Sequence, residues 1–190
     1  MSRILAFSGS ARKDSFNQKL AAAAARHAEA AGADVTLISL RDYPMPLFNQ
    51  DEEAEHDQPD AVKALKELFV EHDGLLISAP EYNGSITPLL KNTLDWLSRQ
   101  HDDEPSMVAY RNKTAAIMGA SPGGLGGLRG LVHVRAILSN LGVLVIPKQF
   151  ALGAAYKAFD DEGDLASERD RDTVIQLTAN LVQTTDRLSA

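Results

Sequence analysis

Short apolar runs alternate along this chain with longer segments in which apolar residues recur at helical spacing. The apolar runs have the length of buried strands, which we predict at 3–8, 34–40, 74–79, 113–120 and 143–147. The longer segments predict helices at 15–32, 60–72, 87–100, 125–142 and 168–188. Strands that alternate with helices in this way are typical of a parallel sheet covered by helices on both faces.

The number of strands favours one of the two common orders of such sheets. We predict an α/β, flavodoxin-like, doubly wound sheet of five parallel strands in the order 2-1-3-4-5, and a single domain over residues 1–190. In this order the connections change direction between the first and third strands, and ligands bind beyond the carboxyl ends of the strands there. The loops to inspect are therefore 9–15 and 80–86, with 119–126 beside them.

The composition excludes several classes of function. The formal charge of −7 disfavours a nucleic-acid-binding protein, which needs a cationic face for phosphates. The chain has no cysteine, which excludes disulfides, thiolate metal sites and thiol catalysis, and its 5 histidines show no metal-ligand spacing. No segment approaches the roughly 20 apolar residues of a membrane span, and the N-terminus lacks the apolar core of a signal peptide. We therefore expect a cytoplasmic protein whose partners are small molecules.

The loop after the first strand, GSARKDSFN, has the features of a phosphate site. Gly9 would let the chain turn sharply. Polar side chains that could bind an anion follow it, namely Ser10, Arg12, Ser15 and Asn17. The loop leads into a helix N-terminus, whose free N–H groups and positive dipole end attract anions. Ser15 could alternatively be only a helix cap, because Ser15 and Gln18 fit a capping box, but a cap would not explain Ser10 or Arg12.

The third strand ends in an unusual sequence, PEYNG. Pro80 stops the strand, Gly84 permits a turn, and Thr87 and Pro88 start the next helix. The segment could be a plain turn. Since it follows the strand at the point where the connections change direction, it could instead run along a flat ligand.

The loop after the fourth strand begins with GASPG, which matches the G-x-S-x-G turn of serine hydrolases. We exclude that chemistry for two reasons. The residue after the nucleophile must donate its N–H to the oxyanion, and Pro122 has no N–H. No acid lies between Ser121 and His133, the only later histidine. What remains is a loop of small residues that lets a flat ligand approach the backbone.

Together, GSARKDSFN, PEYNGSITPLLKNTLDW and SPGGLGGLRG closely resemble the NAD(P)H-dependent FMN reductase family, which includes bacterial chromate and quinone reductases with the flavodoxin-like fold. The resemblance covers about residues 2–150 and includes PLFNQD. It implies that the FMN phosphate is held by Ser10, Arg12, Ser15, Phe16 and Asn17. It implies that the isoalloxazine ring lies along Pro80, Glu81, Tyr82, Asn83 and Gly84. The other edge of the ring would be flanked by Ser121, Gly123 and Gly124.

The resemblance also implies a mechanism. NADPH or NADH would pass a hydride to bound FMN and leave, and a quinone, azo compound, free flavin or metal oxyanion would then take its place, which gives ping-pong kinetics. Because the flavin carries the chemistry, we name no catalytic side chain. Backbone N–H groups of 82–84 would stabilise negative charge on the flavin. The alternative is a flavodoxin-type electron carrier without NAD(P)H activity. The acidic net charge favours this alternative, because such carriers dock to basic partners, whereas Arg12 argues against it, because their phosphate loops are typically rich in Thr and Ser and lack arginine.

Members of this family usually form homodimers or homotetramers. One face of the helix at 87–100 could supply a subunit contact or could pack on the sheet, and it carries Leu89, Leu90, Thr93, Leu94 and Leu97. Tyr82 could cover its own flavin or that of a neighbouring subunit. A preference for NADPH would need a basic partner for the 2′-phosphate, for which the candidates are Arg111, Lys113 and Arg129. Two segments, 41–59 and 148–164, are expected to be long loops of the kind that act as lids or are disordered.

Overall fold

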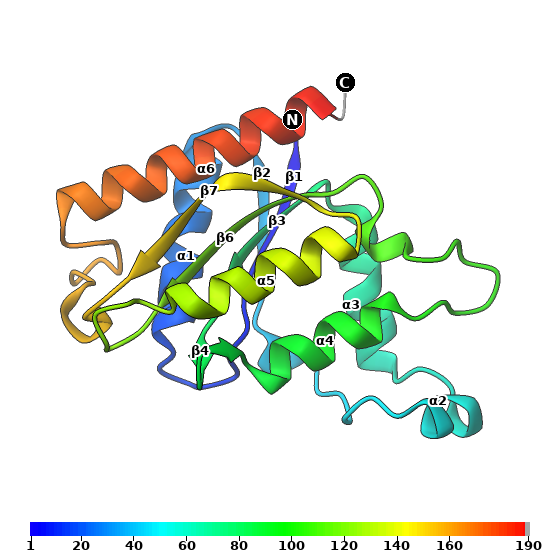
Figure 1. Ribbon diagram of the computed structural model, residues 1–190. Coiled ribbons are helices and arrows are strands. Elements are labelled where there is room, and N and C mark those ends of the chain that lie inside the picture. Colours follow the sequence, from blue (N-terminus) through cyan, green and yellow to red (C-terminus); the bar gives the residue numbers. More distant parts are fainter. Residues whose placement is uncertain (189–190) are drawn as a thin grey trace.

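The computed structural model describes residues 1–188 and is built on a five-stranded sheet in the order β2-β1-β3-β6-β7 (Figure 1). Its strands are β1 (Arg3–Ser8), β2 (Asp34–Leu37), β3 (Gly74–Ser78), β6 (Thr114–Ala120) and β7 (Leu144–Leu152). Neighbouring strands pair in parallel throughout. Numbered along the chain, the strands of this sheet have the order 2-1-3-4-5, so the predicted flavodoxin-like order is confirmed.

Helices cover both faces of the sheet. The covering helices are α1 (Phe16–Ala30), α3 (Asp60–Glu71), α4 (Pro88–Ser98), α5 (Leu128–Asn140) and α6 (Glu168–Leu188), whereas the short α2 (Gln50–His56) has no buried residue. Figure 1 shows α1 and α6 on one side of the sheet and α3, α4 and α5 on the other, and the apolar core divides into the same two layers. Within residues 1–188, no helix is both long and apolar enough to cross a membrane.

The core forms because the central strands are apolar on both faces, as strands of a covered parallel sheet are. In β1, Ile4 and Ala6 pack under α1 and α6, whereas Leu5 and Phe7 face the other layer. In that second layer the ring centroids of Phe7 and Phe69 lie 5.5 Å apart. Successive residues of a strand point to opposite faces, so a continuous apolar run fills both layers at once.

The ends of α1 and α4 follow from their sequence signals. Ser15 caps α1, and its Oγ accepts a hydrogen bond from the N–H of Gln18 (3.3 Å). The capping box is only half formed, because the side chain of Gln18 donates instead to the carbonyl of Ile38 (3.1 Å). Thr87 caps α4 through the N–H of Leu90 (3.2 Å), and Pro88 is the first helical residue, as predicted.

The strand β7 is longer than the predicted 143–147. Its pairing with β6 is interrupted by a bulge between Ala115 and Ile117, beyond which the strand continues to Leu152. The bulge is held from α5 by Arg135, whose guanidinium donates to the carbonyls of Val145 (3.2 Å), Ile146 (2.9 Å) and Pro147 (3.3 Å). An edge strand tolerates a proline, so Pro147 does not end it. Residues 148–152 therefore belong to the sheet and not to a loop.

The predicted loop 41–59 contains the helix α2 and is tied to α4. The side chains of Asn92 and Trp96 both donate to the carbonyl of Pro46 (2.8 Å each). Asn92 also accepts from the N–H of Phe48 (2.7 Å). The segment is thus an ordered strap along α4.

The apolar face of α4 packs on the sheet, which is one of the two alternatives left open above. Leu90, Thr93, Leu94 and Leu97 are all buried, and Leu89 is half-buried. Leu90, Leu94 and Leu97 fill the core beside Ile77 and Leu131, so this part of the face is not available for a contact between subunits.

Candidate functional site

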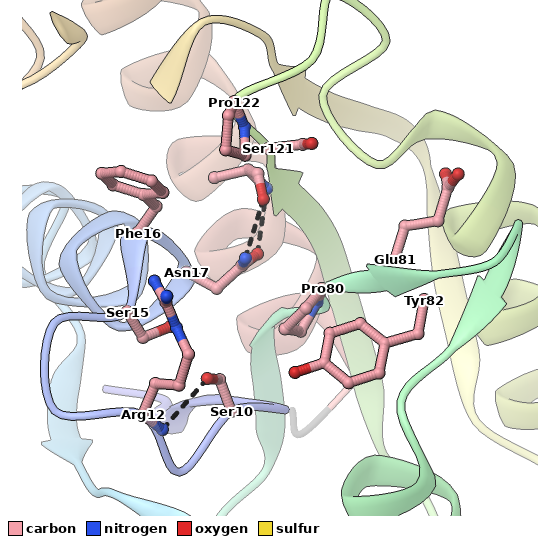
Figure 2. A pocket seen from close by; sticks show the side chains of 11 residues that line it. Ser10, Arg12, Ser15, Phe16, Asn17, Pro80, Glu81, Tyr82, Ser121 and Pro122 are labelled. Carbon is pink, nitrogen blue, oxygen red and sulfur yellow. Dashed lines mark hydrogen bonds between the residues drawn. The ribbon is translucent and has the colours of Figure 1, made fainter. Parts of the chain in front are cut away.

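The carboxyl ends of β1, β3 and β6 lie side by side, and the loops that follow them surround one cavity of about 230 Å³ (Figure 2). The cavity is lined by Ser10, Arg12, Ser15, Phe16, Asn17, Pro80, Glu81, Tyr82, Ala120, Ser121 and Pro122. All five predicted phosphate-loop residues line it, together with Pro80, Glu81, Tyr82 and Ser121. Four predicted residues do not line it, namely Asn83, Gly84, Gly123 and Gly124. The site therefore lies where the strand order predicts, at the point between β1 and β3.

The loop after β1, in which we predict the phosphate site (the predicted phosphate loop), places hydroxyl and guanidinium groups at one side of the cavity. Ser10 Oγ accepts the N–H of Arg12 (3.3 Å), and the Arg12 guanidinium donates to the carbonyl of Asp14 (3.0 Å). Figure 2 shows this guanidinium extending towards Ser15 and Phe16, and its central carbon lies 6.0 Å from the centre of the Phe16 ring. The first residues of α1 have no intrahelical acceptor for their N–H groups. This side of the cavity is therefore rich in donors and positive charge.

Gly9 is needed for close packing and not for a turn, which corrects our expectation. A Cβ at Gly9 would lie 3.0 Å from Leu90 Cβ and 3.2 Å from Pro80 Cδ. The hydroxyl of Thr87 donates to the Gly9 carbonyl (2.7 Å), and the Gly9 N–H donates to the carbonyl of Ser78 (2.9 Å). The base of the predicted phosphate loop is thus fixed between the end of β3 and the start of α4.

Asn17 joins three elements at the floor of the cavity. Its side-chain nitrogen donates to the carbonyl of Ala120 (2.8 Å), and its oxygen accepts the N–H of Ala120 (2.9 Å) and the hydroxyl of Ser78 (3.0 Å). The side chain is buried, so most of its hydrogen-bonding capacity holds α1 to the ends of β3 and β6. One N–H of the amide remains for a ligand.

Arg41 is a second cation at the predicted phosphate loop, and the sequence analysis missed it. Its guanidinium donates twice to the carbonyl of Ala11, from Nε (3.0 Å) and from Nη2 (2.6 Å). Arg41 follows the predicted second strand, 34–40, which neighbours the first strand in the order 2-1-3-4-5. The predicted strand order therefore contained the signal that would have placed this arginine beside the loop.

The PEYNG segment forms a β-hairpin, which the sequence analysis did not predict. The short strands β4 (Glu81–Tyr82) and β5 (Ser85–Ile86) pair antiparallel, and Asn83 (φ +52°) and Gly84 (φ +82°) form the turn between them. Asn-Gly is the commonest pair in a two-residue hairpin turn, because both residues must have positive φ. The turn residues do not line the cavity, whereas Tyr82 does, with its hydroxyl directed towards Ser10 (Figure 2).

Glu81 contributes to the cavity wall, but its side chain points towards α5 (Figure 2). Its carboxylate accepts the N–H groups of Arg129 (3.0 Å) and Gly130 (3.1 Å) and the Arg129 Nε (2.8 Å). Burial would raise the pKa of Glu81, but the hydrogen bonds from Arg129 and Gly130 outweigh burial and lower it below its ordinary value. The carboxylate is therefore charged and fully engaged with the helix.

The glycines of the loop after β6 have different surroundings. A Cβ at Gly126 would lie 2.6 Å from the carbonyl carbon of Ala151, so this glycine lets the loop pack on the end of β7. A Cβ at Gly124 would meet nothing within 4 Å, and one at Gly123 would lie 3.7 Å from Ser121 Oγ, which accepts the Gly123 N–H (3.2 Å). The part of the loop that lines the cavity is Ala120 to Pro122.

A protein-family model described as NADPH-dependent FMN reductase matches residues 2–157. The chain belongs to this family. A curated relative, an NADPH:quinone oxidoreductase of Arabidopsis thaliana, is 36% identical over 189 residues, which are 98% of this chain and 93% of the relative. A quinone reductase of Escherichia coli is 36% identical over 151 residues, or 80% of this chain and 77% of the relative. The solved structure of the flavoenzyme NAD(P)H:(acceptor) oxidoreductase from Paracoccus denitrificans matches with a TM-score of 0.81 at 25% identity, and the match covers 98% of both chains.

Membership of the FMN reductase family confirms the resemblance that the three loops indicated. It also confirms the expected enzyme class, an NAD(P)H-dependent oxidoreductase, and the expected cofactor, FMN. A flavodoxin from the domain Archaea matches with a TM-score of 0.62 at 12% identity, which shows the shared fold alone.

Two of the three candidates for the nucleotide 2′-phosphate lie at the wrong edge of the sheet. Arg111 and Lys113 precede Thr114, the first residue of β6, whereas the cavity lies at Ala120, the last. Lys113 is buried, its ammonium donates to the carbonyl of His72, and burial lowers its pKa. Arg129 lies on the correct side but is paired with Glu81.

Proposed function

We propose that the protein uses FMN held in this cavity to pass hydride from NADPH or NADH to small acceptors such as quinones, free flavins, azo compounds or metal oxyanions. The observation that carries the proposal is the convergence of three loops, from the ends of β1, β3 and β6, on one cavity with a cationic end. The family match and the names of two curated relatives as quinone oxidoreductase and quinone reductase support quinones as acceptors.

The residues that line the cavity fit FMN. At one end, Arg12 can neutralise a phosphate, and Ser10, Ser15 and the start of α1 supply further donors. Elsewhere in the lining, Pro80, Pro122 and the Tyr82 ring present flat, largely apolar surfaces. Donors and positive charge suit the phosphate of the cofactor, and the flat apolar surfaces suit its ring system.

When bound, FMN would supply the hydride chemistry. The protein would bind and orient it: Arg12 at the phosphate, and Pro80 and Tyr82 beside the ring. The titratable side chains that line the cavity are Arg12, Glu81 and Tyr82, and Glu81 is engaged with α5. We therefore name no acid or base, and a single cavity that receives the nucleotide and the acceptor in turn predicts ping-pong kinetics.

We further propose that residues 1–190 act as one domain and that the protein assembles as a homodimer or homotetramer. Exposed apolar side chains support the second proposal, because Leu125 just before α5 and Leu128 and Val132 in its first turns are exposed on the helix that packs against the hairpin. A subunit contact there would lie near the hairpin that carries Tyr82.

Spectroscopy of the purified protein with FMN and reduced nucleotide tests the main proposal. We expect the flavin band in the visible spectrum to bleach when NADPH or NADH is added without air, and to return when a quinone is added. Protein that binds FMN but is not bleached would point to a flavodoxin-type carrier. Protein that takes up no FMN would refute both functions. Steady-state rates with both nucleotides against quinones, free FMN, an azo dye and chromate would then define the acceptors and show whether the kinetics are ping-pong.

A further inference from the structure

The helix α5 begins without a cap of its own. Its N-cap position is Gly127 (φ +89°), which has no side chain, so the first N–H groups of the helix need another acceptor. Glu81 supplies it from the hairpin, 48 and 49 residues away along the chain, through the N–H groups of Arg129 and Gly130. The Arg129 side chain then pairs with the same carboxylate, whose side chain is 8% exposed. A carboxylate at a helix N-terminus is favoured by the helix dipole as well.

The hairpin also lies directly against this helix. Gly130 faces it, and a Cβ there would lie 3.2 Å from the Ser85 carbonyl oxygen and 3.4 Å from Glu81 Cβ. A second hydrogen bond joins Ser85 Oγ and His133 Nδ1 (2.8 Å). Both strands of the hairpin are therefore fastened to α5: β4 through Glu81 and β5 through Ser85.

Glu81 and Tyr82 are successive residues of one strand, so their side chains point in opposite directions. Glu81 points to α5, and Tyr82 lines the cavity (Figure 2). Within residues 1–188, the two-residue strand β4 pairs with the equally short β5, which is held by the buried Ile86 and by Ser85. On β4 itself, Glu81 makes the side-chain contact with α5, so its attachment contributes to where Tyr82 and the turn Asn83–Gly84 stand relative to the cavity.

We infer that Glu81 is a positioning residue: it influences the binding of cofactor and acceptor by holding the hairpin that carries Tyr82. Its carboxylate does not itself contact the flavin ring. This inference rests on the proposed function for the identity of the ligand. The resemblance places Glu81 along the flavin ring; we infer instead that its carboxylate caps α5. Gly130 then has the function of leaving room for the hairpin to lie against this helix.

The test compares Glu81→Gln and Gly130→Ala with a matched control, Glu53→Gln. Glu53 is 14% exposed and accepts Arg99 Nε on both carboxylate oxygens (3.1 and 2.8 Å), but it belongs to α2, far from the hairpin (Figure 1). The two backbone N–H groups share Glu81 Oε2, and the Arg129 side chain donates to Oε1. Glu81→Gln keeps one acceptor oxygen but removes the charge and places an NH2 group against a donor, either the Arg129 guanidinium or the helix N–H groups. Gly130→Ala keeps the Glu81 charge and favours the helix, but pushes the hairpin away.

We expect both hairpin variants to weaken FMN binding by about tenfold, because a displaced hairpin moves Tyr82 from its place in the cavity lining. We also expect a raised KM for the acceptor and a kcat within about twofold of the unmodified protein at saturating FMN, because the chemistry itself is untouched. In the FMN-free protein, amide hydrogen exchange of residues 81–86 should become faster in both variants. Glu53→Gln should leave FMN affinity, KM and this exchange unchanged.

Two results would overturn the inference. One is a folded Glu81→Gln protein with unchanged FMN affinity and unchanged exchange in the hairpin. The other is a large loss of kcat at saturating FMN with normal exchange, which would make Glu81 a direct contact. If Glu81→Gln does not fold, the same measurements on Gly130→Ala test the inference, and unchanged FMN affinity with unchanged hydrogen exchange in the hairpin would overturn it. If the unmodified protein binds no FMN, the proposed function fails, while the exchange experiment still tests the attachment of the hairpin.

Discussion

Replacing Arg12 by alanine tests the phosphate assignment most directly. In the structure, Arg12 is exposed, and its guanidinium donates one hydrogen bond, to the carbonyl of Asp14 (3.0 Å). Loss of this bond should change the stability of the FMN-free protein by no more than about 0.5–1 kcal/mol, because exposed groups exchange it for water. Loss of a charge-assisted contact to a phosphate should weaken FMN binding by about 1.5–3 kcal/mol, or about tenfold to a hundredfold.

Riboflavin, which carries the same ring without the phosphate, separates the two halves of the site. We expect Arg12→Ala to lower the affinity for FMN, measured by quenching of flavin fluorescence, and to leave the affinity for riboflavin within about twofold. Arg12→Lys should recover part of the loss, since it keeps the charge but not the planar fork. Equal losses for FMN and riboflavin would mean that Arg12 supports the ring or the fold. No loss for FMN would refute the phosphate assignment.

Three further predictions concern groups around and away from the cavity. Arg41→Ala should weaken FMN binding by about 0.5–1.5 kcal/mol. This loss should be smaller than for Arg12→Ala, because Arg41 acts through the carbonyl of Ala11. A larger loss of affinity than for Arg12→Ala in the same fluorescence titration would contradict this. The lowered pKa of Glu81 means that its bonds stabilise the fold above the ordinary carboxyl pKa and that this stability disappears as pH falls through the lower folded value. In urea unfolding at pH 7, Glu81→Gln should therefore have a lower free energy of unfolding than the unmodified protein, and this difference should narrow below about pH 4. A difference that stays constant with pH would count against the ion pair. Lys66→Met should lower the free energy of unfolding by about 2–4 kcal/mol and leave FMN affinity unchanged. The substitution removes a buried ammonium that donates to Glu104 and to two other acceptors. A decrease below about 1 kcal/mol would show that water satisfies these acceptors.

The elements that the sequence predicts well are those whose signals are local. Apolar runs long enough to fill both layers placed the strands, and caps such as Ser15 and Thr87 placed the starts of α1 and α4. The strand order then located the cavity, because the loops after β1, β3 and β6 must meet at one edge.

The features that the sequence analysis missed or misinterpreted depend on partners far along the chain. The resemblance places Glu81 along the flavin ring, and nothing in the sequence indicates that its carboxylate accepts hydrogen bonds from residues 48 and 49 positions later. Gly9 looked like a turn residue, but the constraint on it comes from Leu90. The extension of β7 past Pro147 follows a bulge whose carbonyls accept hydrogen bonds from Arg135 on α5. The hairpin at Asn83–Gly84 is the exception, because its signal is local: an Asn-Gly pair by itself favours a two-residue hairpin turn.

Asn17 has a consequence for how the protein acquires its cofactor. Its amide joins α1 to Ser78 and Ala120, which lie 61 and 103 residues further along the chain. Closing loops of this length early in folding is entropically costly, so this junction belongs to the late, cooperative stage of assembly. A nascent or truncated chain that ends before Ala120 would have the complete predicted phosphate loop and still lack the floor of the cavity. We therefore expect uptake of FMN to follow assembly of the sheet, so that a flavin-loaded molecule is one that has finished folding.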